Sequence, residues 1–286
     1  MSRDATEKGV LYIVATPIGN LQDMTWRAVD TLKSVDRVAA EDTRHSRKLF
    51  AHYGIATPLL ALHEHNERDI SRRLLDRLLA GERIALVSDA GTPLISDPVF
   101  VLVRAARQAG VRVVPVPGPS ALVAALSVSG LPTDRFLFEG FLPPRQAARR
   151  QRLQALRGSE VTLVFYESSH RILDSLVDMA DCLGAARHAV VARELTKTFE
   201  TLVEGTLTEL LERLRNDADQ QKGEFVVLVQ GAVHDPDQLD EAARHTLEVL
   251  LGQLPLRQAA ALAAGISGVS KNRLYEYGLE LKNRSS

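Results

Sequence analysis

Cysteine is almost absent from the sequence, and this limits the kinds of site that the chain can build. Cys182 is the single cysteine among 286 residues. A disulfide framework within one chain is therefore excluded, as is a zinc or iron–sulfur site made of several cysteines. The helical, apolar surroundings of Cys182 favour a buried structural residue over a nucleophile. This cysteine usage suits a reducing, cytoplasmic compartment.

An excess of charge of one sign is also missing. The 35 Lys and Arg residues nearly balance the 36 Asp and Glu residues, so the net charge is -1. This excludes binding of nucleic acid through bulk basic charge and leaves only a local basic patch for that role. No apolar run approaches the ~18 residues of a membrane helix. The first residues are polar, so we expect neither a signal peptide nor contact with a membrane.

Two common nucleotide-binding motifs are absent as well. No two glycines are separated by one residue, which excludes the Gly-x-Gly-x-x-Gly dinucleotide fingerprint, and no Walker-type Gly-x-x-x-x-Gly-Lys occurs. His63-Glu-His65 comes nearest to a metal cluster. Its spacing does not put two ligands on one helix face, so we expect a solvated loop and no metal site.

The sequence does contain a long alternation of strand and helix patterns. Strands are expected at residues 10–15, 36–40, 83–88, 112–116, 136–139, 161–166, 188–192 and 225–229. Helices are expected at 25–34, 46–53, 67–80, 99–109, 119–129, 149–156, 171–182 and 206–216. Thr206 and Glu209 predict a capping box at the start of the last of these helices. The alternation predicts an α/β fold with largely parallel sheets.

The C-terminal segment has a different, all-helical pattern. Helices are expected at 240–251, 255–264 and 270–281, with Ser270 as an N-cap. The last two helices, joined by a Gly-containing turn, are typical of either a helix-turn-helix or a plain helical hairpin. A chain of 286 residues lies near the ~250–300 limit of one core. We therefore predict two α/β domains, at 1–118 and 119–235, and a small helical segment at 236–286.

Three strand ends carry loops rich in Pro, Gly and small polar residues. They follow the strands that end near Ala15, Ser88 and Val116, and each precedes a helix. In open α/β sheets, ligands bind at the carboxyl ends of the strands. Because these loops lack the Gly pairs that cradle a pyrophosphate, they favour a ligand held by backbone amides and carbonyls.

The chain resembles the tetrapyrrole methylase superfamily, which uses S-adenosylmethionine (AdoMet), and within it a family of small-subunit ribosomal RNA 2'-O-ribose methyltransferases. Five blocks carry the resemblance: Ala15-Thr-Pro-Ile-Gly-Asn-Leu21, Ala40-Glu-Asp-Thr-Arg44, Ser88-Asp-Ala-Gly-Thr-Pro93 with Ile95-Ser-Asp-Pro98, Gly140-Phe-Leu-Pro143, and Tyr166-Glu-Ser-Ser-His-Arg171. The family usually has Gly after the Asp-Pro pair, whereas this chain has Val99.

The resemblance implies that AdoMet binds in the cleft between the two α/β domains. It places these residues around the cofactor: Pro17, Asp89, Ala90, Gly91, Thr92, Ile95, Ser120, Ala121 and Tyr166. The reaction that it implies is methylation of a cytidine ribose 2'-hydroxyl in 16S ribosomal RNA, on the assembled small subunit, by a homodimeric enzyme.

Transfer to a hydroxyl needs in-line positioning and a group that either accepts the proton or stabilises charge on oxygen. Two clusters that follow strand ends supply candidates: Asp42, Arg44, Glu194 and Lys197. The alternative for both clusters is purely structural ion pairing.

Residues 140–159 contain five arginines and no acid, an asymmetry on a chain of net charge -1. The candidate RNA-binding residues are Arg145, Arg149, Arg150, Arg152 and Arg157, together with Lys271 and Arg273 in the C-terminal helices. Two other functions stay open. The same fold could methylate a tetrapyrrole or a diphthamide precursor, or the chain could be a non-catalytic RNA-binding assembly factor.

Overall fold

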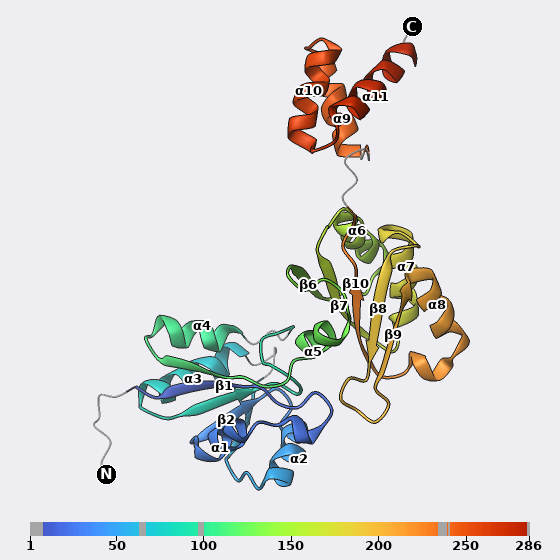
Figure 1. Ribbon diagram of the computed structural model, residues 1–286. Coiled ribbons are helices and arrows are strands. Elements are labelled where there is room, and N and C mark those ends of the chain that lie inside the picture. Colours follow the sequence, from blue (N-terminus) through green and yellow to red (C-terminus); the bar gives the residue numbers. More distant parts are fainter. Residues whose placement is uncertain (1–7, 63–66, 97–99, 234–238, 240, 285–286) are drawn as a thin grey trace. The chain divides into compact units, whose positions relative to one another are not determined.

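The computed structural model describes residues 8–62, 67–96, 100–233, 239 and 241–284 (Figure 1). Within these ranges the chain divides into two compact units, Met1–Ala232 and Val233–Ser286. The first unit contains two sheets, and the second contains helices only. No helix in the described ranges combines the length and apolar character that crossing a membrane requires.

The first sheet is parallel throughout, as predicted. Its strands are β1 (Val10–Val14), β2 (Arg37–Ala40), β3 (Leu59–Ala61), β4 (Ile84–Val87) and β5 (Arg112–Val116). They lie in the order β3-β2-β4-β1-β5, and every neighbouring pair is parallel. The sequence did not predict β3, which has only three residues and follows a proline. In this order the loops after β1, β4 and β5 leave neighbouring strands at one edge of the sheet.

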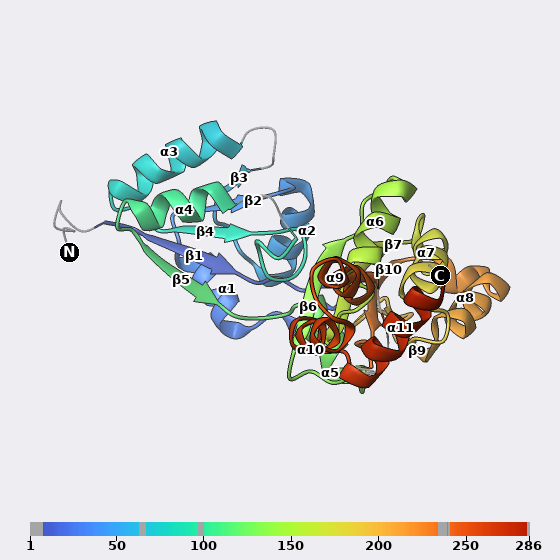
Figure 2. The same ribbon diagram turned by 90° about the horizontal axis from the view of Figure 1, so that it is seen from above.

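Helices cover both faces of this sheet (Figure 2). The helices are α1 (Trp26–Ser34), α2 (Thr43–Tyr53), α3 (Glu67–Leu79) and α4 (Phe100–Gln108), with the short 3-10 helix η1 (Leu21–Asp23) before α1. Helices α1 and α2 pack with the sheet in one apolar cluster, and α3 and α4 pack in another. Thr25 and Asp42 cap α1 and α2 by accepting hydrogen bonds from backbone N–H groups of the first turn.

The second sheet is mixed, so the prediction of largely parallel sheets is wrong for this half. Its strands are β6 (Phe136–Phe141), β7 (Thr162–Ser168), β8 (His188–Arg193), β9 (Thr201–Thr206) and β10 (Glu224–Val229), in the order β6-β7-β10-β8-β9. Only β6 and β7 pair in parallel. Strand β10 is antiparallel to both neighbours, and β8 and β9 form an antiparallel pair. The sequence missed β9 because its residues run directly into the predicted capping box.

Helices also cover the two faces of the second sheet. Helix α5 (Ala121–Val128) packs on one face, and α6 (Gln146–Leu156), α7 (Ile172–Leu183) and α8 (Leu207–Asn216) pack on the other; the 3-10 helix η2 (Ala218–Gln221) follows α8. Thr206 and Glu209 form the predicted capping box at the start of α8. Since α5 follows the β5 loop but packs on the second sheet, its N-terminus joins the two halves of the first unit. We call the halves built on the first and on the second sheet the first and the second domain.

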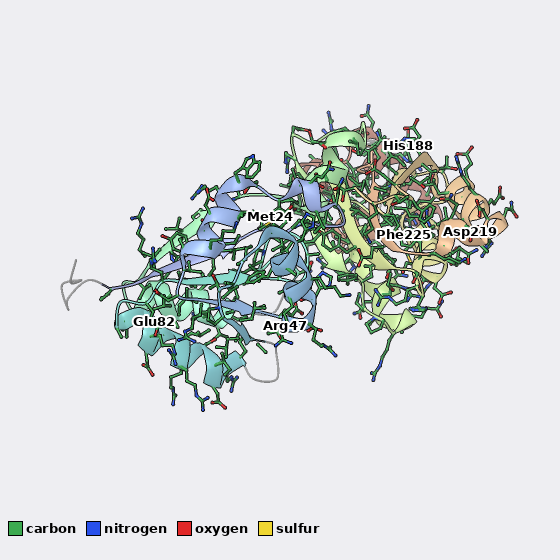
Figure 3. All side chains as sticks on the ribbon, turned by 90° about the horizontal axis from the view of Figure 1, so that it is seen from below. Met24, Arg47, Glu82, His188, Asp219 and Phe225 are labelled. Carbon is green, nitrogen blue, oxygen red and sulfur yellow. The ribbon has the colours of Figure 1, made fainter. Side chains whose placement is uncertain are left out.

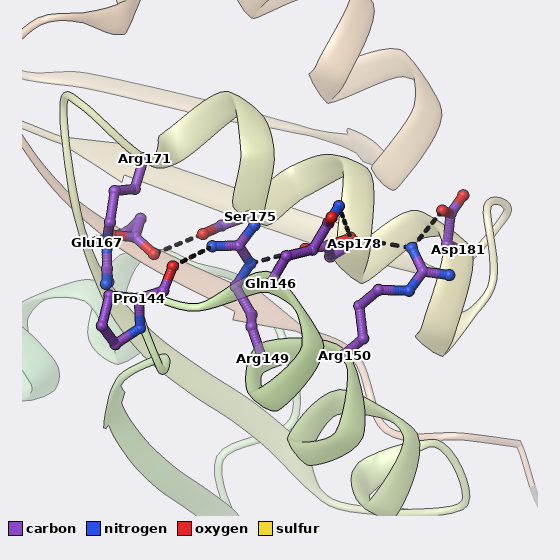
Figure 4. Close-up of polar contacts among 9 residues, drawn as sticks. All are labelled: Pro144, Gln146, Arg149, Arg150, Glu167, Arg171, Ser175, Asp178 and Asp181. Carbon is purple, nitrogen blue, oxygen red and sulfur yellow. Dashed lines mark hydrogen bonds and ion pairs between the residues drawn. The ribbon is translucent and has the colours of Figure 1, made fainter.

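A buried ion pair fastens α6 to α7 (Figure 4). The Arg149 side chain is 4% exposed, and its Nε donates to Asp178 at 2.7 Å, whose side chain is 0% exposed. Gln146 and Arg150 donate to the other Asp178 oxygen at 3.3 and 2.9 Å. Burial would raise the pKa of Asp178, but the hydrogen bonds from Arg149, Arg150 and Gln146 outweigh it and lower the pKa. Asp178 is therefore a carboxylate in the folded protein.

This network corrects the prediction that Arg149 binds RNA phosphates; for the other arginines of 140–159 that role stays a prediction. Arg149 is buried and cannot reach a phosphate. Arg150 pairs with Asp178 and Asp181, and Arg152 donates to Glu139 at 2.6 Å. The acids that neutralise these arginines come from β6 and α7, outside the basic segment of sequence. Arg145 and Arg157 are exposed.

The second unit consists of α9 (Glu241–Leu251), α10 (Leu256–Ser267) and α11 (Lys271–Arg284). Its core joins apolar residues of the three helices, among them Leu247, Ala260 and Leu274. Gly268, with φ of 74°, ends α10, and the Ser270 hydroxyl accepts a hydrogen bond from the Arg273 N–H at 3.3 Å, as an N-cap does. Lys271 is exposed, and Arg273 lies 3.4 Å from Glu276.

We expect Asp178→Ala to destabilise the first unit by about 3–5 kcal/mol, because it leaves the buried Arg149 guanidinium without its carboxylate. Urea unfolding measures this. Folding lowers the Asp178 pKa from 3.8. The ionised Asp178 therefore contributes its whole stabilising free energy above about pH 4, and this contribution is lost as the pH falls through the pKa of the folded state. The difference between wild type and variant should therefore shrink in acid.

Asp181→Ala is the matched control. The Asp181 side chain is 52% exposed, and its pair with Arg150 should contribute less than ~1 kcal/mol. Equal effects of the two substitutions would contradict the importance of the buried pair.

Candidate functional site

A cleft of about 380 Å³ lies where the loops of the first sheet meet the second sheet. The first domain lines it with Ile18, Ala90, Gly91, Thr92, Ile95 and Ser96, and the segment that enters α5 adds Ser120 and Ala121. The second domain lines it with Phe141, Tyr166, Glu167, Ser168, Ser169, Ala192, Glu194, Leu195, Lys197, Gly223, Glu224, Phe225 and Val226. Its size lies within the usual range for small-molecule sites.

Hydrogen bonds between loops hold the first-domain wall in shape. Thr16 and Gly91 exchange backbone hydrogen bonds of 2.9 and 3.0 Å, which pair the loop after β1 with the loop after β4. The Thr92 hydroxyl donates to the Pro119 carbonyl at 3.1 Å and so joins the loop after β5. Gly91 has φ of 77°, and a Cβ there would lie 3.3 Å from Ile18. A larger residue would be strained at this position and would press on the cleft wall.

The aromatic rings of Phe141 and Tyr166 form part of the opposite wall. Tyr166 makes edge contacts with Phe138 and Phe141, at centroid distances of 4.9 and 5.7 Å. The Tyr166 hydroxyl accepts a hydrogen bond of 3.0 Å from the N–H of Leu122, in the first turn of α5. Tyr166 thereby ties the second sheet to the helix whose N-terminus lines the cleft.

Glu167 is a buried carboxylate in the cleft wall that sequence reasoning missed. It is 2% exposed and accepts hydrogen bonds from the Ser168 N–H at 2.8 Å, Arg171 at 2.9 Å and the Ser175 hydroxyl at 2.6 Å. Figure 4 shows it between Arg171 and Ser175. These bonds fix the turn that brings Ser168 and Ser169 to the cleft. Glu167 belongs to the block Tyr166-Glu-Ser-Ser-His-Arg171, in which only Tyr166 was predicted to be a site residue.

Lys197 is the only Lys or Arg among the described residues that line the cleft. Its Nζ donates to Glu194 at 2.7 Å and to Glu224 at 2.9 Å, and its side chain is 28% exposed. Burial would lower the Lys197 pKa, but the bonds to Glu194 and Glu224 outweigh it and raise the pKa above its ordinary 10.5. Lys197 is therefore a cation at neutral pH.

The loop that carries Lys197 has an unusual backbone. Glu194 and Thr196 have φ of 49° and 67°, in the left-handed region that non-glycine residues rarely occupy. Two glycines make room for it: a Cβ on Gly19 would lie 2.3 Å from Lys197 Cγ, and one on Gly223 would lie 2.5 Å from Glu194. Neither glycine was identified from the sequence.

The carboxylate beside Lys197 is ionised as well. Burial would raise the Glu194 pKa, but hydrogen bonds from Lys197 and from the Glu224 N–H, the latter 2.9 Å long, outweigh it and lower the pKa. Glu194 is consequently a weak base that fixes Lys197, and the cluster has the form of a cation held in place by two carboxylates.

The other catalytic candidates, Asp42 and Arg44, do not line the cleft. Asp42 accepts hydrogen bonds from the Arg44 side chain and from the Arg44 N–H that it caps, and these bonds hold its pKa far below the ordinary range. Such a carboxylate is a poor base. Its own N–H donates to Asp89 at 2.9 Å, which connects the start of α2 to the loop of Gly91.

The structure brings most of the predicted cofactor residues to one cleft. The residues Ala90, Gly91, Thr92, Ile95, Ser120, Ala121 and Tyr166 line it. Pro17 and Asp89 do not, although each directly precedes a lining residue, Ile18 and Ala90 respectively. His63, His65 and Val99 lie outside the described residues. Within the described ranges, His, Cys, Asp and Glu form no group that could hold a metal ion.

Residues 10–211 match the family described as Tetrapyrrole (Corrin/Porphyrin) Methylases, and residues 237–282 match the RsmI C-terminal HTH domain. Among solved structures, a diphthine synthase has a TM-score of 0.62 at 16% identity, over 79% of this chain and 92% of that one. A uroporphyrin-III C-methyl transferase from Thermus thermophilus, complexed with S-adenyl homocysteine, has a TM-score of 0.52 at 20% identity, over 77% of this chain and 97% of that one. These likenesses show the fold.

Relatives of much higher identity span nearly the whole chain. Ribosomal RNA small subunit methyltransferase I of Pseudomonas aeruginosa is 56% identical over 279 residues, 97% of this chain and 99% of the relative. The protein of the same name from Escherichia coli O157:H7 is 54% identical over 96% of both chains. With both family matches in place, the chain belongs to the ribosomal RNA small subunit methyltransferase I family, within the tetrapyrrole methylases.

Proposed function

We propose that the protein is an AdoMet-dependent methyltransferase that methylates the 2'-hydroxyl of a cytidine ribose in 16S ribosomal RNA, on the assembled small subunit. The observation that carries the proposal is the cleft, in which a preorganised, largely apolar wall faces a fixed cation. The names of the close relatives supply the small-subunit RNA. The cytidine, the 2'-oxygen and the assembled subunit rest on the family resemblance.

The lining suits a cofactor with an apolar chain, a ribose and an aromatic base. Small residues at Ala90, Gly91 and Ala121 let a ligand approach the backbone, and Thr92 and Ser120 bring polar groups. Tyr166, with its hydroxyl engaged, presents an aromatic ring to the cleft. A structural relative solved with S-adenyl homocysteine supports the same class of cofactor. We assign these residues, with Ile95 and the supporting Pro17 and Asp89, to cofactor binding.

The cation in the cleft suits transfer to a weakly acidic hydroxyl. Held against Ala90, Gly91 and Thr92, AdoMet would supply an electrophilic methyl group on sulfonium, with the thioether as the leaving group, and the proton of the accepting hydroxyl would pass to water. Lys197, held protonated by Glu194 and Glu224, donates to the ribose oxygen, orients it and stabilises negative charge that develops there. The raised Lys197 pKa excludes Lys197 as a base at neutral pH.

Two alternatives are less well supported. The fold alone would equally suit a methylase of a tetrapyrrole or diphthamide precursor, as in the solved relatives, but these are at most 20% identical. A non-catalytic RNA-binding factor would not need a preorganised cleft. A homodimer stays a prediction from the resemblance; exposed apolar residues on the edge strand β6 and on α5, such as Phe136 and Val123, are compatible with it.

We expect the purified protein to transfer label from radiolabelled AdoMet to small subunits isolated without their native methylation. Nuclease digestion and mapping should place the label on a cytidine 2'-oxygen of 16S RNA. Protein-free 16S RNA, assayed in parallel, tests the requirement for the assembled subunit. If the protein binds AdoMet in equilibrium dialysis but transfers no label to RNA, the proposed substrate is wrong and the proposed cofactor stands. If it neither binds AdoMet nor transfers label, the proposal that it is a methyltransferase is wrong.

Lys197→Met should lower kcat about 100-fold and leave the Kd for AdoMet nearly unchanged, because it removes a donor needed only for transfer. Gly91→Val is the contrasting variant and should abolish AdoMet binding. Since the wild-type Lys197 pKa lies above 10.5, its charge should cause no fall in kcat between about pH 7 and 9. A Lys197→Met enzyme with full kcat would remove Lys197 from the mechanism.

A further inference from the structure

The exposed face of α2 is a continuous basic surface beside the cleft. Residues 43–53 contain Arg44, His45, Arg47, Lys48 and His52 and no acid. On a helix these five side chains, with Ala51, occupy one face, and all six residues are exposed. The opposite face is buried through Ser46, Leu49 and Phe50. Every charged or titratable side chain on the solvent face of α2 is thus an Arg, a Lys or a His.

The cations on this face remain available to a ligand. Among the described residues, Arg47 and Lys48 make no ion pair. Arg44 uses Nε and Nη2 to bind Asp42, yet its side chain is 85% exposed and no described contact uses Nη1. The contrast with α6 is sharp, since Arg149, Arg150 and Arg152 are all engaged by acids.

The position of α2 connects this surface to the site of chemistry. The helix begins at the carboxyl end of β2, which neighbours β4, and the Asp42 N–H donates to Asp89 in the loop that continues into the cleft wall. Figure 3 places Arg47 at the end of the first domain opposite to Glu82, which precedes β4. Arg47 therefore lies at the end of the sheet that carries the cleft loops.

We propose that the basic face of α2, formed by Arg44, His45, Arg47, Lys48 and His52, binds the phosphate backbone of the RNA substrate next to the nucleotide that enters the cleft. Arginine and lysine side chains are the usual donors to phosphate oxygens. This inference rests on the proposed RNA substrate, and it replaces α6 as the principal phosphate-binding surface of the first unit.

The test is the double variant Arg47→Glu with Lys48→Glu, which leaves the Arg44–Asp42 cap intact. We expect KM for unmethylated small subunits to rise about tenfold at physiological salt, with kcat and the Kd for AdoMet unchanged. The slope of log affinity against log salt should fall by roughly 1.5, since two phosphate contacts are lost. The charge-conserving pair Arg47→Lys with Lys48→Arg should restore most of the affinity.

The matched control is Arg72→Glu with Arg73→Glu, the same charge change at exposed sites on α3, which packs on the other face of the same sheet. Equal KM changes in both double variants, or none in α2, would overturn the inference while wild-type methylation still stands. A loss of affinity for subunits with unchanged affinity for protein-free 16S RNA would also overturn it, because α2 would then face a protein. Failure of the wild type to methylate RNA would instead overturn the proposed function.

Discussion

The cleft depends on the mutual hydrogen bonds between Thr16 and Gly91. They convert two separate strand-end loops into one short antiparallel bridge at the edge of a parallel sheet. The bridge requires the left-handed backbone of Gly91, and it fixes where Ala90 and Thr92 stand. Through Thr92 it also holds the entry to α5. A single glycine therefore sets the wall to which we assign cofactor binding.

The second domain contributes a different kind of order, in which ion pairs and a strained backbone hold a charged side chain in place. Lys197 stays protonated because two carboxylates outweigh its partial burial. The left-handed backbone at Glu194 and Thr196 costs free energy of order 1–3 kcal/mol per residue, which the surrounding sheet must offset. Such strain is typical of residues that function requires in one position. The first domain thus determines the shape of the cleft wall, and the second domain supplies the charged side chain in the cleft.

Structural features that depend on residues close in sequence could be predicted from the sequence, and features that depend on residues close only in space could not. The alternation of strands and helices, the capping box at Thr206 and the strand-end loops are local, and the structure confirms them. The antiparallel insertion of β10 between β7 and β8 depends on long-range pairing, so periodicity could not predict it. The residue type of Glu167 was visible in its block of sequence, but the hydrogen bond that it accepts from Ser175, in the next helix, was not.

The same distinction governs where a phosphate can bind. Counting charge along α6 predicts a basic surface, but the acids of β6 and α7 neutralise it in space. On α2 the helical period places the Arg, Lys and His side chains on the face opposite to the buried one. The Asp42 carboxylate caps the helix by accepting a hydrogen bond from the Arg44 N–H. Because long-range attraction to RNA depends on net local charge and not on the number of arginines, α2, whose Arg47 and Lys48 face no acid among the described residues, is the stronger site.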